Sequence, residues 1–199
     1  MPASAAPFGL QMWGGATHAD NNPPVLEIAY GAVDIATAMA KGSILNIGAS
    51  APTLGAATPT TTRDGNTPWG IVTGFRFNTA PGTAPFGYND YLPANAITAG
   101  FKNIYIQYIP AVTAIMVIQA TANTGASTAI GKNAAITYTA PDAVRKVSKI
   151  ALNAATIATT NTLALKIVGF AGGTDTDTIP NYLVVWNQNV HAWSNILGV

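Results

Sequence analysis

The side chains that could support metal binding are few and lie far apart in this sequence. The two histidines, His18 and His191, are near opposite ends of the chain, and cysteine is absent. A zinc site needs three or four histidine, cysteine or carboxylate ligands, and only Asp20 is close to His18 in sequence. We therefore interpret both histidines as structural or surface residues, and we expect no metal and no cofactor.

A second candidate for ion binding is a pair of aspartates near the C-terminus. Asp175 and Asp177 have the spacing of the first two ligands of a calcium-binding loop. The chain then continues as Thr178-Ile179-Pro180, without the glycine at position six or the closing glutamate of such a loop. The pair is better interpreted as part of a polar turn.

Patterns of nucleophilic or acid–base catalysis are also missing from the sequence. The six serines have no evident base partner, and neither a Gly-x-Ser-x-Gly elbow nor a Gly-rich phosphate loop occurs. The eight acidic residues, of which Glu27 is the only glutamate, are scattered along the chain. Because catalysis requires groups with tuned pKa values, the sequence predicts a protein that is not an enzyme.

The composition favours a component of a larger assembly. Of 199 residues, 49% are hydrophobic and only 9% are charged, against about 25% charged in ordinary soluble domains. Nine basic residues face eight acidic ones, so a nucleic-acid partner is not expected. Depletion of charge is typical of the core of a permanent protein interface.

Three aromatic residues and one basic cluster are candidates for contacts with other subunits. The aromatics are Trp69, Tyr88 and Tyr91, for which a carbohydrate site is the alternative interpretation. The basic cluster contains Arg145 and Lys146 and is followed by Lys149. A solvated loop is the alternative there, since three charges bind nucleic acid only weakly.

Residues 1–29 are predicted to form an extended N-terminal arm, because prolines and a Gly-Gly pair exclude a regular helix. The arm carries four large apolar side chains: Phe8, Leu10, Met12 and Trp13. Each would cost roughly 1.5–3 kcal/mol if left in water. We expect them to act as anchors, either on the chain's own body or on a neighbouring subunit.

The rest of the chain is predicted to form short strands and long loops. A turn at Lys41-Gly42 is expected to join two strands as a hairpin, the first including Val33 and Ile35 and the second covering residues 43–47. Further strands are predicted at residues 69–77, 103–108, 113–120, 133–138, 150–152, 162–168, 182–186 and 190–193, with long loops at 49–67 and 78–100 and turns at 121–128 and 172–177.

These elements predict an all-β protein with a β-sandwich or barrel body, an extended N-terminal arm and long contact loops. We place a β-rich subdomain at residues 30–100 and the main domain at residues 101–199. The apolar stretch at residues 104–122 contains Pro110 and two glutamines and alternates in part. We interpret it as two strands rather than a membrane helix, and no membrane partner is expected.

The second half of the chain, roughly residues 104–193, resembles the capsid decoration, or cement, proteins of tailed bacteriophages. The segments that carry the resemblance are Ile115-Met116-Val117-Ile118-Gln119-Ala120, Ile130-Gly131-Lys132-Asn133-Ala134, Leu163-Ala164-Leu165-Lys166-Ile167-Val168-Gly169-Phe170, and the run from Asn181 to His191. These are packing and turn motifs, not catalytic signatures.

The resemblance implies a non-enzymatic structural protein of the virion, located on the outer surface of the capsid. Such a protein would bind the major capsid protein as a homotrimer, bridge neighbouring capsid proteins and stabilise the head. Two alternatives remain open: a host-surface or glycan-binding module displayed on the virion, and a jelly-roll coat protein.

Overall fold

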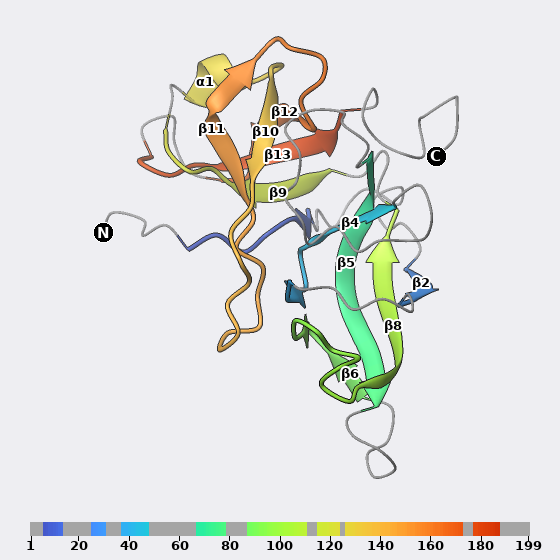
Figure 1. Cartoon of the computed structure of the whole chain (residues 1–199). Coiled ribbons are helices and arrows are strands. Elements are labelled where there is room, and N and C mark those ends of the chain that lie inside the picture. Colours follow the sequence, from blue (N-terminus) through green and yellow to red (C-terminus); the bar gives the residue numbers. More distant parts are fainter. Residues whose placement is uncertain are drawn as a thin grey trace.

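The computed structural model describes residues 6–13, 25–30, 37–47, 67–78, 87–110, 115–123, 126–172 and 177–187. Within these ranges the chain forms thirteen β-strands and one single-turn helix, α1 (Ala126–Ala129). Strands account for nearly all of the regular structure (Figure 1). The predicted all-β class is therefore confirmed.

The first sheet contains six strands in the order β1-β9-β13-β12-β10-β11, and each neighbouring pair is antiparallel. The strands are β1 (Gln11–Met12), β9 (Met116–Gln119), β13 (Asn181–Trp186), β12 (Leu165–Phe170), β10 (Asn133–Thr137) and β11 (Ala151–Ala158). The sheet curls until the end of β9 meets β11, where Ala120 and Leu152 form a parallel bridge. The N–H of Thr121 donates to the Leu152 carbonyl at 2.9 Å. The result is a half-barrel, shown at the top of Figure 1.

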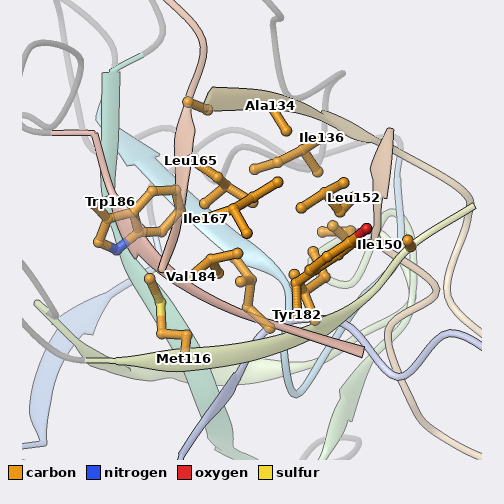
Figure 2. Packing of buried hydrophobic residues seen from close by; sticks show 14 of the residues in the cluster. Met116, Ala134, Ile136, Ile150, Leu152, Leu165, Ile167, Tyr182, Val184 and Trp186 are labelled. Carbon is orange, nitrogen blue, oxygen red and sulfur yellow. The ribbon is translucent and has the colours of Figure 1, made fainter. Parts of the chain in front are cut away.

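The inside of the half-barrel is filled by apolar side chains from alternate strand positions. In β13, Tyr182, Val184 and Trp186 are fully buried, whereas the residues between them are partly exposed. This alternation follows from the two-residue period of a strand. Figure 2 shows these side chains meeting those of Leu165 and Ile167 from the neighbouring strand β12.

The second sheet has the order β2-β8-β5-β4, and β6 also pairs with β5. Its strands are β2 (Leu26–Ala29), β8 (Lys102–Ile109), β5 (Thr67–Asn78), β4 (Ile44–Ile47) and β6 (Gly87–Asn89). Phe75, Phe77, Ile106 and Tyr108 are buried in its own core. The rings of Phe77 and Phe101 meet edge to face, with centroids 4.9 Å apart.

The two sheets share part of one core. Ile44, Ile71 and Ile109 belong to β4, β5 and β8, yet they lie in the same buried cluster as the side chains of the half-barrel. The open side of the half-barrel is thus lined by one end of the second sheet. The boundary near residue 100 between two domains stays a prediction.

The hairpin predicted around Lys41-Gly42 is wrong, although the turn itself is present. Gly42 has a φ of +85°, and the N–H of Ser43 donates to the Ala40 carbonyl at 3.0 Å. The strand before the turn, β3 (Met39–Ala40), pairs with β7 (Tyr91–Leu92), and β4 pairs with β5. Each side of the turn therefore finds its hydrogen bonds in a different neighbour.

Other elements differ from the prediction in extent. The strands β6 and β7 lie within the predicted loop 78–100, and α1 lies within the predicted turn 121–128. The strand β11 continues to residue 158 rather than ending at 152. The Asp175, Val33 and Ile35 positions, the loop at 49–66 and the strand at 190–193 lie outside the described residues, as do His18, Asp20 and His191.

Candidate functional site

The described part of the N-terminal arm, residues 6–13, is attached to the chain's own half-barrel. The N–H of Ala6 donates to the Gln119 side chain at 2.9 Å. The short strand β1 pairs with β9, and the N–H of Trp13 donates to the Ile115 carbonyl at 3.0 Å. Leu10 is buried in the core and Met12 packs against it. Phe8 is partly buried, and Trp13 remains 38% exposed.

The arm reaches the half-barrel through a close crossing of three backbones. Gly9 has a φ of +78°, and a Cβ at this position would lie 2.6 Å from the Ser148 Cβ and 2.7 Å from the Gly42 carbonyl oxygen. The N–H of Leu10 donates to the Gly42 carbonyl, and the N–H of Ser148 donates to the Lys41 carbonyl. Glycine is needed at both crossing positions because the backbones leave no room for a side chain.

The connection between β10 and β11 forms a projecting loop, which we call the tip loop (residues 142–147). In Figure 1 it extends downward from the half-barrel. Asp142 organises it: one carboxylate oxygen accepts the N–H groups of Val144 and Arg145, each at 3.0 Å. The N–H of Lys146 donates to the Asp142 carbonyl at 2.7 Å, and the Asp142 N–H donates to Val147 at 2.9 Å.

The groups around Asp142 favour the ionised carboxylate, which is the form that accepts these backbone hydrogen bonds. The N–H of Arg145 holds the pKa of the Asp142 carboxyl below its usual value. The N–H of Val144 and the positive charges of Lys149 and Arg145 act in the same direction. The ammonium of Lys149 lies 3.6 Å from the second carboxylate oxygen. The loop is therefore closed by an ionised aspartate at neutral pH.

The tip loop presents one apolar and two basic side chains to solvent. Val144 is 91% exposed, and Arg145 and Lys146 are also exposed. Lys146 has a φ of +57°, an uncommon conformation for a residue with a side chain. Val144 is thus an exposed apolar side chain beside two basic ones, on a loop whose backbone is held by Asp142.

Two residues that are distant in sequence, Tyr88 and Lys146, line the same surface hollow of about 330 Å³. We call it the polar hollow. It lies between the second sheet and the tip loop, and its lining residues are Thr73, Gly74, Tyr88, Asn89, Asp90, Gln107 and Lys146. The structure thus brings together two of the predicted contact residues, with Arg145 next to them in the tip loop.

The outer face of the second sheet forms one wall of the polar hollow. Tyr88, Arg76 and Tyr105 stand opposite one another on β6, β5 and β8, so they share a face. The Arg76 guanidinium lies over the Tyr105 ring, 4.7 Å from its centroid, and pairs with Glu27. Of these three residues, Tyr88 is the most exposed, and 74% of its surface is accessible to solvent.

A β-bulge forms the floor of the polar hollow. In the pairing of β5 with β8, Val72 is opposite Tyr108 and Gly74 is opposite Gln107, which leaves Thr73 as the extra residue. Within the described residues, the buried Thr73 hydroxyl has no hydrogen-bond partner. Bulges redirect side chains and are frequent beside binding sites. Sequence analysis did not single out Thr73, Asn89, Asp90 or Gln107, because these residues converge only through strand pairing.

The remaining predicted contact residues lie elsewhere. Trp69 is in the first half of β5, away from the β5–β6 pairing. Tyr91 is partly buried in β7 and is close enough to Tyr138 to raise the pKa of that phenol, although burial of Tyr138 is the larger cause. Neither residue lines the polar hollow.

The residues that line the polar hollow include one acidic residue, Asp90, and one basic residue, Lys146, and the others are uncharged. Among the described residues, no group of three histidine or acidic side chains could hold a metal ion. In the same part of the chain, no helix has the length and apolar character to cross a membrane.

No family model, curated protein or solved structure matches this chain.

Proposed function

We propose that this protein is a non-enzymatic structural protein of a virion, which binds the outer surface of the capsid and bridges neighbouring capsid proteins. The proposal rests on the resemblance of its second half to phage decoration proteins. The tip loop is the observation that supports it best. A nearly fully exposed Val144 stands next to Arg145 on a loop whose backbone is fixed by Asp142.

A fixed loop of this kind suits docking, because little conformational freedom is lost when the partner binds. Val144 would enter an apolar notch between capsid proteins, and Arg145 and Lys146 would face acidic groups at its rim. Trp13, partly exposed where the arm leaves β9, would add a second contact. The major capsid protein is the proposed partner, and the assembly on the shell is a homotrimer.

The protein would stabilise the capsid because its binding is coupled to the assembled state of the shell. A protein that binds the assembled shell and not its separated subunits stabilises the shell in proportion to its occupancy. It also opposes separation of the two capsid proteins that it bridges.

The experiment is co-sedimentation of the purified full chain with shells from the source particle. We expect the double substitution Val144→Ser and Arg145→Ser to weaken shell binding about tenfold or more, which corresponds to about 1.4 kcal/mol. Val168→Ser is the matched control, because Val168 is also an exposed valine (41%) but lies on β12. Equal losses in the two variants, or no loss in the double variant, would contradict docking through the tip loop.

A further inference from the structure

We infer that the polar hollow is a binding site for a neutral carbohydrate. This inference goes beyond the proposed capsid role and does not depend on it. It rests on three features of the hollow: an aromatic platform, a set of groups that both donate and accept hydrogen bonds, and a floor that a glycine keeps open.

The aromatic platform is Tyr88. Its side chain is 74% exposed although it lies in a strand that pairs with β5. An exposed tyrosine ring offers a flat apolar face on which a ligand can stack. A sugar ring presents an apolar face of C–H groups, which can cover the face of an aromatic ring, and a rim of hydroxyls, which need polar partners.

Those polar partners surround Tyr88. The Gln107 amide can donate and accept hydrogen bonds, and the Asn89 carbonyl oxygen beside Gly74 is a further acceptor. Asp90 adds an acceptor and Lys146 adds a donor. A hydroxyl group also donates and accepts, so this set matches a polyhydroxylated ligand. One acid and one base in the lining leave no net charge, which favours a neutral ligand over a polyanion.

The floor of the hollow explains its size. Gly74 stands opposite Gln107, and a Cβ at this position would lie 3.4 Å from the Gln107 side-chain oxygen and 3.5 Å from the Asn89 carbonyl oxygen. These are ordinary contact distances. An alanine would therefore fit without strain, but it would occupy the floor. The volume of about 330 Å³ is at the lower end of ligand pockets, so we expect one or two sugar units to be bound.

The test uses the purified full chain on an array of neutral oligosaccharides built from glucose, galactose, mannose and N-acetylglucosamine, with sulfated and sialylated counterparts. The strongest neutral ligand is then titrated calorimetrically. We expect saturable binding that is at least about tenfold weaker in Tyr88→Ala, because the stacking surface is lost. Tyr88→Phe, which keeps the ring, should retain most of the affinity.

Gly74→Ala supplies the second variant, with Gly169→Ala as its control. Gly169 also follows the extra residue of a bulge, and its Cβ would meet only the Leu183 side chain, at 3.7 Å. We expect weaker binding in the first variant and unchanged binding in the second. Absence of saturable binding to every neutral oligosaccharide overturns the inference, as does binding that survives both Tyr88→Ala and Gly74→Ala. A preference for acidic sugars that is lost in Lys146→Ala overturns the neutral assignment.

Shell co-sedimentation separates this inference from the proposed capsid role. Gly74→Ala should bind shells like the unaltered chain, because it leaves Val144 and Arg145 of the tip loop in place. Loss of sugar binding with intact shell binding supports the inference. Loss of both in Gly74→Ala would show that the hollow is part of the shell contact and would overturn a separate carbohydrate site.

Discussion

Two β-bulges, one in each of the two larger sheets, have the same local form but opposite surroundings. In β12 the pairing with β13 shifts between Ile167 and Gly169, and in β5 the pairing with β8 shifts between Val72 and Gly74. In each strand a glycine follows the extra residue. Gly169 faces the apolar side chain of Leu183, and next to it the rings of Phe170 and Tyr182 stack at 5.4 Å. Gly74 faces amide and carbonyl oxygens at the floor of the polar hollow.

This difference shows that a bulge does not define a binding site by itself. The bulge in β12 adds curvature to the half-barrel, whose interior is closed by Leu165, Ile167 and Trp186. The bulge in β5 occurs where the sheet's outer face is left open and polar. We expect substitutions in the half-barrel to change stability, and substitutions around the polar hollow to change binding.

The largest predicted effect comes from truncating the core side chain of the half-barrel. Trp186→Ala should lower the free energy of unfolding by about 3–5 kcal/mol, because a buried aromatic side chain leaves a cavity. Tyr88→Ala should change it by less than about 0.5 kcal/mol, since the ring is exposed. Urea unfolding followed by circular dichroism measures both. Similar losses of unfolding free energy in Trp186→Ala and Tyr88→Ala would contradict the expected difference between the half-barrel core and the polar hollow.

A somewhat smaller loss is expected at the backbone crossing that fastens the arm. Gly9→Ala should destabilise the chain by about 3 kcal/mol, because the Cβ would overlap Ser148 and the Gly42 carbonyl in addition to the strain of a positive φ. Gly131→Ala is the control: its φ of +84° is similar, and nothing lies within 4 Å of the added carbon. Only the strain, about 1–2 kcal/mol, should appear there. Equal urea unfolding midpoints for Gly9→Ala and Gly131→Ala would contradict the steric overlap expected where the arm crosses Gly42 and Ser148.

A smaller effect, confined to acid pH, is expected in the tip loop. The folded-state pKa of Asp142 is depressed, so its carboxylate stabilises the fold at pH values above the unfolded pKa of about 3.9. That contribution is lost as the pH falls through the folded pKa. Asp142→Asn should therefore be less stable at neutral pH and should lose less stability on acidification. The measurement is the thermal unfolding midpoint of Asp142→Asn and of the unaltered chain from neutral pH to about pH 3. Equal decreases of the midpoint with pH in the two proteins would contradict the prediction.

The smallest effect on stability is expected for the two strand glycines. Gly74→Ala and Gly169→Ala should each lie within about 1 kcal/mol of the unaltered chain, because the added carbon makes only ordinary contacts at both sites. Differential scanning calorimetry at neutral pH measures this directly. A much larger loss in Gly74→Ala would mean that the floor of the polar hollow is packed, and would remove the basis for its use in the binding test.

Much of the strand pattern was predictable from sequence because burial follows a two-residue period. The predicted strands at 69–77, 103–108 and 182–186 correspond to β5, β8 and β13. In β8 from Ile104 to Tyr108, and throughout β13, buried positions alternate with partly exposed ones. By contrast, four of the eight residues of β11 (Ala151–Ala158) are alanines. Alanine gives only a weak hydrophobic pattern, so the second half of this strand was not predicted.

The partners of the strands were not predictable, and the candidate site depends on them. The turn at Gly42 was expected to join a hairpin, but hydrogen bonds from Gly42 to Val72 and from Lys41 to Asp90 send its two sides to different sheets. The bulge at Thr73 is set by the register of β5 against β8. Tyr88 and Arg145 were singled out as contact residues from their types alone, and the sequence could not show that their segments approach each other.

The pairing of β1 with β9 also has a consequence for how the chain is made. Gln11 pairs with Val117, more than a hundred residues later in the order of synthesis. At about 5–20 residues per second, the ribosome needs on the order of 5–20 s to deliver the second strand after the first. During that interval Leu10 and Met12, which the finished protein covers, are accessible to chaperones. We expect nascent chains stopped before β9 to be the ones that a chaperone retains.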